Sequence, residues 1–330
     1  MGELASWNPD QVPGPLSESV VDWDYYMENY MLILPRYIGR SRPAEDTLRT
    51  YQKGIRSFLI WCIKQPIHPK RVEDYQMRFY VESLTKSGYR PATLGLYVTA
   101  VRTFYRVAMR LGLVQDNPCA DIQVPSPFTT DRQFTFFTPE QEGEIIEAME
   151  QEPDEVSRTR GLAILYLMGV EGLRKVEVHR MNDEDIHLDE GYIFIHGKGH
   201  DGTIYPSPET CDRVREYIAC RPEPKKDGLL TPTFISLCRR TKGQRLSRFG
   251  IGEIMKKVLR ASGYDQKGIA CHVFRHSCGT NLYAATKDIR IVQETLRQRD
   301  PKVTARYAHV HQRMSSHYTS AIVPRKKDDK

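Results

Sequence analysis

Hydrophobic positions in the first third of the chain recur with the spacing typical of amphipathic helices. The pattern predicts four helices, over residues 24–40, 48–62, 72–87 and 91–112. The third is followed by Gly88, a residue type common just after a helix, and the fourth opens at Pro91. Together these segments predict a small helical domain that buries one face of each helix.

The second half of the chain mixes helical segments with short alternating stretches. Residues 158–169 are strongly apolar, which predicts a buried helix. Residues 185–188 and 191–196 alternate and are rich in β-branched side chains. A Gly-Lys-Gly turn then leads to residues 203–206, and the whole predicts a β-hairpin. Further helices are expected over 209–220 and 249–261 and from residue 270. The predicted fold class is mainly α with a small antiparallel β-sheet.

Composition divides this chain of 330 residues into two domains. Residues 1–23 are rich in Pro, Ser and acids and are expected to form a flexible tail. Residues 24–118 form the helical domain, and residues 119–137, with two prolines and many small polar residues, form a linker. The second domain is expected over 138–322, followed by a disordered tail over 323–330.

The charge is concentrated in the helical domain. The whole chain carries a net charge of +6, which is weak evidence for a polyanionic partner. Residues 1–35 hold six acids and no Lys or Arg, whereas residues 36–118 hold fifteen Lys and Arg against six Asp and Glu. A separately basic domain points to a phosphate-rich partner such as nucleic acid.

The cysteines and histidines do not predict a metal site. The seven cysteines are scattered, and we expect reduced thiols, as in the cytoplasm. Cys271, His272, His276 and Cys278 could be taken for a zinc cluster, but they fall on about two turns of one helix and point in several directions. No metal or other cofactor is therefore expected. No apolar run is long enough to span a membrane.

A constellation with chemical potential lies between residues 270 and 310. His272 and Arg275 are three residues apart, so they project from one face of a helix. Tyr307 follows in a short basic segment. A histidine, arginines and a tyrosine suffice to attack a phosphodiester without a metal: tyrosine is the nucleophile, histidine moves a proton, and arginine holds the anionic oxygens. Tyr307 could instead be an aromatic residue of the core. Tyr318, eleven residues later, is a rival candidate for the nucleophile.

These segments resemble those of the phage integrase family of tyrosine site-specific recombinases. His-Val-Phe-Arg-His at 272–276 and Tyr-Ala-His-Val at 307–310 are similar to the family's H-x-x-R-H and Y-x-H-V segments. Earlier matches resemble its SAM-like core-binding domain, and the likeness covers residues 25–322. By this resemblance the second domain is a mixed α/β tyrosine-recombinase catalytic domain.

The resemblance implies roles for four more residues. Gly-Leu-Arg-x-x-Glu resembles the first arginine box, in which Arg174 would grip the scissile phosphate and Glu177 would orient it. Lys198, at the tip of the hairpin, would be the general acid. The family places His or Trp nine positions before the tyrosine, where this chain has Gln298, a side chain that cannot carry charge. Arg297 or Arg299 could compensate.

The resemblance also implies a partner and a reaction. The partner would be double-stranded DNA, bound by a homotetramer with possible accessory proteins, and the reaction would pass through a 3′-phosphotyrosine and a Holliday junction. A DNA-binding regulator with a degenerate site and a monomeric topoisomerase remain alternatives. Basic residues of the first domain would contact phosphates, and those of helix 249–261 either do so or form a solvated face. These candidates are Arg49, Lys53, Arg56, Arg90, Arg102 and Arg106, then Lys256, Lys257 and Arg260.

Overall fold

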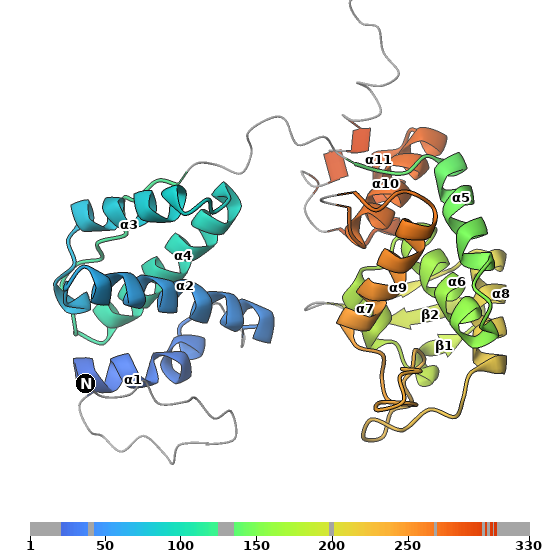
Figure 1. The fold of residues 1–330 in the computed structure, drawn as a ribbon, viewed down its shortest axis with the longest axis horizontal. Coiled ribbons are helices and arrows are strands. Elements are labelled where there is room, and N and C mark those ends of the chain that lie inside the picture. Colours follow the sequence, from blue (N-terminus) through green and yellow to red (C-terminus); the bar gives the residue numbers. More distant parts are fainter. Residues whose placement is uncertain are drawn as a thin grey trace, which may run out of the picture. The chain divides into compact units, whose positions relative to one another are not determined.

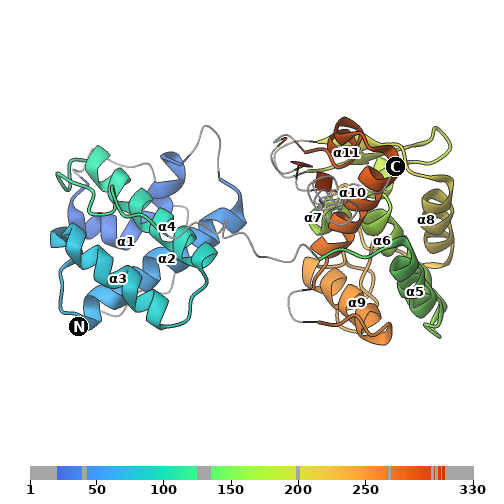
Figure 2. The same ribbon diagram turned by 90° about the horizontal axis from the view of Figure 1, so that it is seen from above.

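The chain folds into two compact units, Met1–Arg132 and Gln133–Lys330. The computed structural model describes residues 21–38, 43–124, 135–197, 201–266 and 269–298, together with residues 301, 304, 305, 307 and 308. Each unit has its own hydrophobic core, and Figure 1 and Figure 2 show the helices of each.

The first unit is helical throughout its described part. It contains α1 (Trp23–Ile33), η1 (Leu34–Arg36), α2 (Glu45–Lys64), η2 (Pro69–Arg71), α3 (Asp74–Lys86) and α4 (Pro91–Arg110). The first helix is shorter than the predicted 24–40, because Pro35 cannot donate a backbone hydrogen bond and the chain tightens into η1.

Helix α2 packs along α4 in this unit (Figure 1). Aromatic side chains pack around the two helices. A Cβ atom at Gly54 would lie 3.0 Å from Cβ of Ala100, so glycine permits this close approach. The buried Tyr26 hydroxyl donates to the carbonyl oxygen of Phe104 at 2.7 Å, which satisfies a polar group inside the core.

The second unit is built around one buried helix, as the apolar segment predicted. Its helices are α5 (Pro139–Glu150), α6 (Glu155–Gly169), α7 (Lys175–Arg180), α8 (Pro208–Cys220), α9 (Arg248–Ala261), α10 (His272–Thr286) and α11 (Ile289–Thr295), with the short η3 (Asp183–Asp185). Helix α6 contacts α5, α7, α8, α9 and α10, which explains why it is apolar on nearly every side.

A small antiparallel sheet completes this unit. Strands β1 (Ile186–His187), β2 (Tyr192–Ile195) and β3 (Gly202–Ile204) lie in that order, with Ile193 opposite Ile204. The predicted fold class, mainly α with a small antiparallel sheet, is confirmed. The predicted hairpin is also present, as β2 and β3.

Candidate active site

The glycine turn after α6 positions the first arginine. Gly172 has a φ of +65°, and a Cβ atom there would lie 2.4 Å from Cδ2 of Leu296. Only glycine combines this left-handed backbone with such a close approach. The turn delivers Arg174 to the N-cap position of α7.

Arg174 is held by a buried carboxylate one turn further along. The backbone N–H of Arg174 donates to Oε2 of Glu177 at 2.8 Å, and its Nη1 donates to Oε1 at 2.7 Å. The Glu177 side chain is only 2% exposed. Burial alone would raise its pKa, but the Arg174 backbone N–H and the charge of Arg297 outweigh burial and lower the pKa. Glu177 is therefore an anion that fixes Arg174.

Arg275 lies in the interior and ties two loops together. Its guanidinium donates to the carbonyl oxygens of Gly172 and Leu296, the residues that precede Arg174 and Gln298 by two positions each. Burial, followed by the charge of Arg174, lowers the pKa of Arg275 to about 10, so it remains a cation near neutral pH. Arg275 therefore brings the segment that carries Arg174 and the segment that carries Gln298 to one place.

His272 begins α10 and is exposed to solvent on part of its ring. Partial burial, followed by the positive charges of Arg275, Lys175 and Arg174, lowers the pKa of this imidazole. At neutral pH the ring is therefore neutral, which is the form that can accept a proton.

Tyr307 lies almost fully buried, with 1% of its surface exposed. Its hydroxyl accepts a hydrogen bond from Nε2 of Gln298 at 3.3 Å and lies 3.5 Å from Nδ1 of His276. Oε1 of Gln298 in turn accepts from the Thr304 hydroxyl at 2.9 Å. The aromatic ring rests against Gly279, where a Cβ atom would lie 2.7 Å from Cζ of Tyr307.

The structure thus brings Arg174, Arg275, Gln298 and Tyr307 together, although they are far apart in the sequence. His272 lies near the two arginines, one turn before Arg275. The structure also adds two residues to which the sequence assigned no definite role, His276 and Arg297. Nη2 of Arg297 donates to Oε2 of Glu177 at 3.1 Å, so one carboxylate serves two arginines. The motif letter after Arg275 was the only sequence signal for His276.

Several predicted features lie outside the described residues. These are Lys198 at the hairpin tip, Arg299, the rival tyrosine Tyr318, and the tail expected over 323–330. The structure describes the strands that precede and follow Lys198, β2 and β3. Just before Lys198, the Gly197 carbonyl oxygen accepts a hydrogen bond from Nη1 of Arg180 at 2.7 Å.

The predicted DNA-contact residues divide into exposed cations and one structural arginine. Exposed side chains belong to Arg49, Lys53, Arg56, Arg90, Arg106, Lys256, Lys257 and Arg260. Arg102 is the exception, because Nε and Nη2 donate to the carbonyl oxygens of Cys119 at 2.8 Å and Ile122 at 2.6 Å. It stabilises the loop after α4, and the phosphate contact predicted for it stays a prediction.

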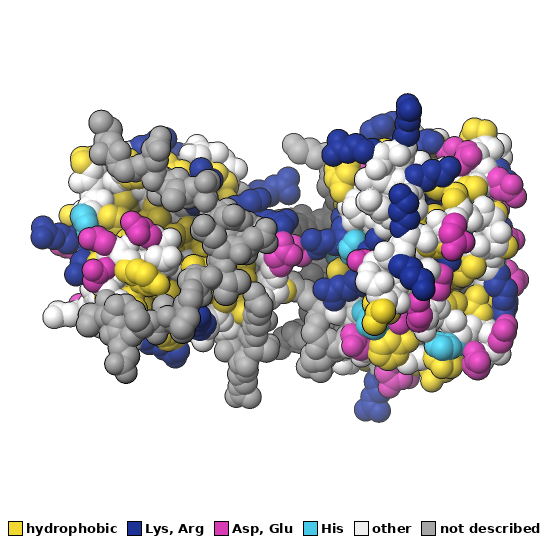
Figure 3. Space-filling model, turned by 90° about the horizontal axis from the view of Figure 1, so that it is seen from below, with side chains coloured by type: hydrophobic (Ala, Val, Ile, Leu, Met, Phe, Trp, Pro, Cys, Tyr) yellow, Lys and Arg dark blue, Asp and Glu magenta, His cyan; other side chains and the backbone are white. Residues whose placement is uncertain are grey.

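Some of the exposed cations are paired with nearby acids. Arg49 pairs with Glu45 at 2.8 Å, and Arg260 pairs with Asp265 at 3.3 Å. Figure 3 shows Lys and Arg side chains on the surfaces of both units with Asp and Glu interspersed. Such exposed pairs are weak, so these cations stay available to a phosphate.

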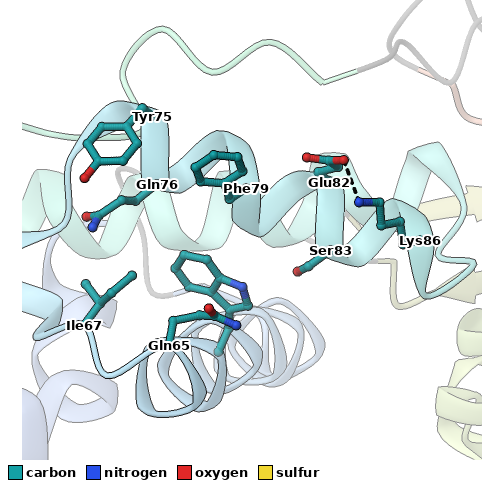
Figure 4. A pocket seen from close by; sticks show the side chains of 9 residues that line it. Gln65, Ile67, Tyr75, Gln76, Phe79, Glu82, Ser83 and Lys86 are labelled. Atoms are coloured by element: carbon teal, nitrogen blue, oxygen red, sulfur yellow. Dashed lines mark ion pairs between the residues drawn. The ribbon is translucent and has the colours of Figure 1, made fainter.

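The first unit also has an open pocket of about 390 Å³ between the end of α2 and α3. Its walls are mostly apolar and include Trp61, Tyr75 and Phe79, and at its rim Glu82 pairs with Lys86 (Figure 4). None of the candidate catalytic residues lines it. Within the described ranges, no three His, Cys, Asp or Glu side chains meet as a metal ion would require. No helix in those ranges is both long enough and apolar enough to cross a bilayer.

Comparison of the sequence with known protein families identifies both units. Residues 135–314 match the phage integrase family, and residues 36–112 match the N-terminal SAM-like domain of phage integrases. The chain belongs to the phage integrase family. It is a tyrosine recombinase, an enzyme that breaks and rejoins DNA in site-specific recombination.

Curated relatives include the tyrosine recombinase XerC of Alcanivorax borkumensis. It is 29% identical over 300 residues, which cover 90% of this chain and 94% of the relative. The tyrosine recombinase XerD of Lacticaseibacillus casei is 28% identical over 81% of this chain and 88% of its own length.

Among solved structures, the XerH recombinase bound to a palindromic difH substrate after cleavage has a similar fold. Its TM-score is 0.69 at 18% identity, over 83% of this chain and 78% of that chain. A lambda integrase tetramer bound to a Holliday junction has a TM-score of 0.64 at 17% identity, over 88% of this chain and 78% of that chain. At these identities the likeness concerns the fold.

Proposed function

We propose that Tyr307 is the nucleophile that cleaves DNA in this recombinase. The observation that carries the proposal is the convergence of the Tyr307 segment, Arg174 and Arg275 at one place, because Arg275 holds the carbonyl oxygens of both Gly172 and Leu296. A phosphodiester is an anion that repels nucleophiles, and its charge grows in the transition state. Fixed cations at this place therefore supply the main stabilisation.

The chemical step balances within the side chains proposed. The phenolic oxygen of Tyr307 forms a bond to phosphorus, and the bond from phosphorus to the 5′-oxygen breaks. His272, neutral because its pKa is lowered, accepts the phenolic proton. Lys198 gives a proton to the leaving 5′-oxygen. The product is a 3′-phosphotyrosine, which keeps the bond energy so that a second DNA end can replace the tyrosine without ATP.

Gln298 and His276 hold the nucleophile in the absence of DNA. The Gln298 amide donates to the Tyr307 hydroxyl, while its own oxygen is fixed by Thr304. We propose that Gln298 takes the place of the family's His or Trp as a neutral hydrogen-bond donor. His276 would orient the hydroxyl from the other side.

The proposed partners are double-stranded DNA and further copies of this chain. The basic side chains of α2 and α4 would contact the phosphates of one duplex, which positions the protein without reading sequence. A tetramer would exchange strands through a Holliday junction, as the tetrameric lambda integrase complex suggests. We keep 24–118 and 138–322 as the bounds of the two domains, joined by the linker 119–137, and place the reaction in the cytoplasm.

Trapping on a nicked DNA substrate tests the proposal. Nicked duplexes carrying a site that this protein selects from a random DNA library would be incubated with wild type, Tyr307→Phe and Tyr318→Phe, without added metal. We expect a covalent adduct on a denaturing gel, lost only with Tyr307→Phe. Loss with Tyr318→Phe instead would assign the nucleophile to that residue. DNA binding without any adduct would indicate an incomplete site.

A further inference from the structure

Arg297 stands beside the phosphate site in a backbone conformation that does not suit it. Helix α11 ends in two backbone hydrogen bonds, from the N–H of Arg297 to the Glu294 carbonyl at 2.9 Å and from the N–H of Gln298 to the Gln293 carbonyl at 3.0 Å. This pattern places Arg297 where helices usually have glycine, and its φ is +49°. An arginine there costs energy that a glycine would avoid.

The side chain of Arg297 is directed inward. It is only 18% exposed. Nη2 donates to Oε2 of Glu177 at 3.1 Å, and Nη1 donates to the Thr295 carbonyl oxygen at 3.0 Å. Its Nε is buried and has no hydrogen-bond partner among the described residues. A strained backbone and a largely buried, incompletely paired cation both lower the stability of the folded protein. An arginine at this position is therefore expected to have a function that glycine could not perform.

The charges around Glu177 indicate what that function is. Around Glu177 alone, three arginines, Arg174, Arg275 and Arg297, face this one anion, which leaves a local net charge of +2 from 3 − 1. Without Arg297 the count would be +1. The neighbouring Gln298 is neutral and is occupied by Thr304 and Tyr307.

We propose that Arg297 is a positioning residue that supplies the phosphate site with the positive charge that Gln298 cannot carry. It acts through Glu177, which it shares with Arg174, and through its field on the scissile phosphate. This inference rests on the proposed function. It explains why an arginine occupies the position after Leu296 although glycine would relieve the backbone.

The decisive variant is Arg297→Gly, because glycine removes the charge and the left-handed strain together. The variant loses the ion pair to the buried Glu177, which keeps Arg174, and gains from the relieved backbone, so thermal unfolding of the same preparation is measured to separate a loss of rate from unfolding. We expect the single-turnover rate of adduct formation to fall on the order of 10- to 100-fold, by analogy with residues that orient metal ligands through a hydrogen bond. Arg297→Lys should lose less.

A matched control removes the same charge and the same strain elsewhere. Lys287 follows α10 with a φ of +57° and is exposed. Lys287→Gly should keep the wild-type cleavage rate. Equal losses in Lys287→Gly and Arg297→Gly would overturn the proposal, because general charge would then explain both.

A neutral substrate separates charge supply from mere support of the loop. A methylphosphonate at the scissile position has a methyl group in place of one non-bridging oxygen and carries no charge. If Arg297 supplies charge, the loss caused by Arg297→Gly should largely disappear on this substrate. An equal loss on both substrates would show that the arginine only supports the loop, and a wild-type rate on the phosphodiester would also refute the proposal. If wild type forms no adduct on either substrate, the proposed function itself fails.

Discussion

Gly279 is the helical position at which a single added methyl group reports on the placement of the nucleophile. It lies within α10, on the side covered by the ring of Tyr307. A Cβ atom there would meet Cζ of Tyr307 at 2.7 Å, Cε1 at 2.8 Å and Cδ1 of Leu296 at 2.9 Å. Gly279→Ala therefore forces the tyrosine ring, the leucine or the helix to move.

The size of the effect follows from these distances. Carbon atoms in contact prefer about 3.5–4.0 Å, so the ring must move by roughly 1 Å. Alanine gains about 1 kcal/mol over glycine inside a helix, whereas overpacking costs about 1–3 kcal/mol. The net loss of folding stability should therefore be about 0–2 kcal/mol. A nucleophile displaced by about 1 Å can lose on the order of 100-fold in rate.

The assay is single-turnover adduct formation on nicked DNA, with thermal unfolding of the same preparations. Gly143→Ala is the matched control, because Gly143 also lies in a helix, α5, and a Cβ atom there meets nothing within 4 Å. We expect the control to be active and slightly stabilised. If Gly279→Ala cleaves DNA as fast as wild type, the observed seat of Tyr307 is not the one used in the reaction.

Two further predictions concern titration. Lys175→Met removes a cation that, after burial and together with two arginines, lowers the pKa of His272. The pKa of His272 should rise, and since the neutral ring is the active form, the acidic limb of the pH–rate profile should move to higher pH. Burial raises the pKa of Glu142 in α5 from 4.5 to about 7, despite the hydrogen bond from Asn281. Its stability contribution therefore falls as pH rises from about 4.5 to 7, and Glu142→Gln should stabilise the protein by about 1–3 kcal/mol at pH 8 and little at pH 4.

Each of these predictions has an outcome that contradicts it. An unmoved acidic limb in Lys175→Met would mean that His272 is not the group whose titration limits cleavage. Equal melting-temperature changes for Glu142→Gln at about pH 4 and about pH 8 would mean that this carboxyl is charged at neither or at both.

Much of the fold could be predicted because its signals are local. Helical spacing of apolar residues, the glycine at 88 after α3 and the proline at 91 that opens α4 each reflect chemistry within a few residues. The buried α6 was evident because a helix covered on every side needs no polar face. The order of motifs along the chain then identified the residues of the candidate site.

The remaining features depend on contacts between distant segments, which spacing does not reveal. Arg102 has the sequence appearance of a DNA contact, yet its guanidinium binds carbonyl oxygens 17 and 20 residues away. Arg297 pairs with Glu177, 120 residues earlier in the chain. His276 approaches Tyr307 only because the tyrosine segment folds back over α10. Such side chains acquire their roles from tertiary structure.

The near-complete burial of Tyr307 also limits which DNA can reach this nucleophile. An enzyme that makes covalent breaks in DNA is harmful whenever its nucleophile attacks DNA at random. Only 1% of the surface of Tyr307 is exposed, and its hydroxyl is engaged by Gln298 and His276. The nucleophile is therefore shielded from DNA in solution. A phosphodiester then reaches this hydroxyl only when a bound duplex displaces these hydrogen bonds while the ring stays against Gly279, so cleavage follows DNA binding.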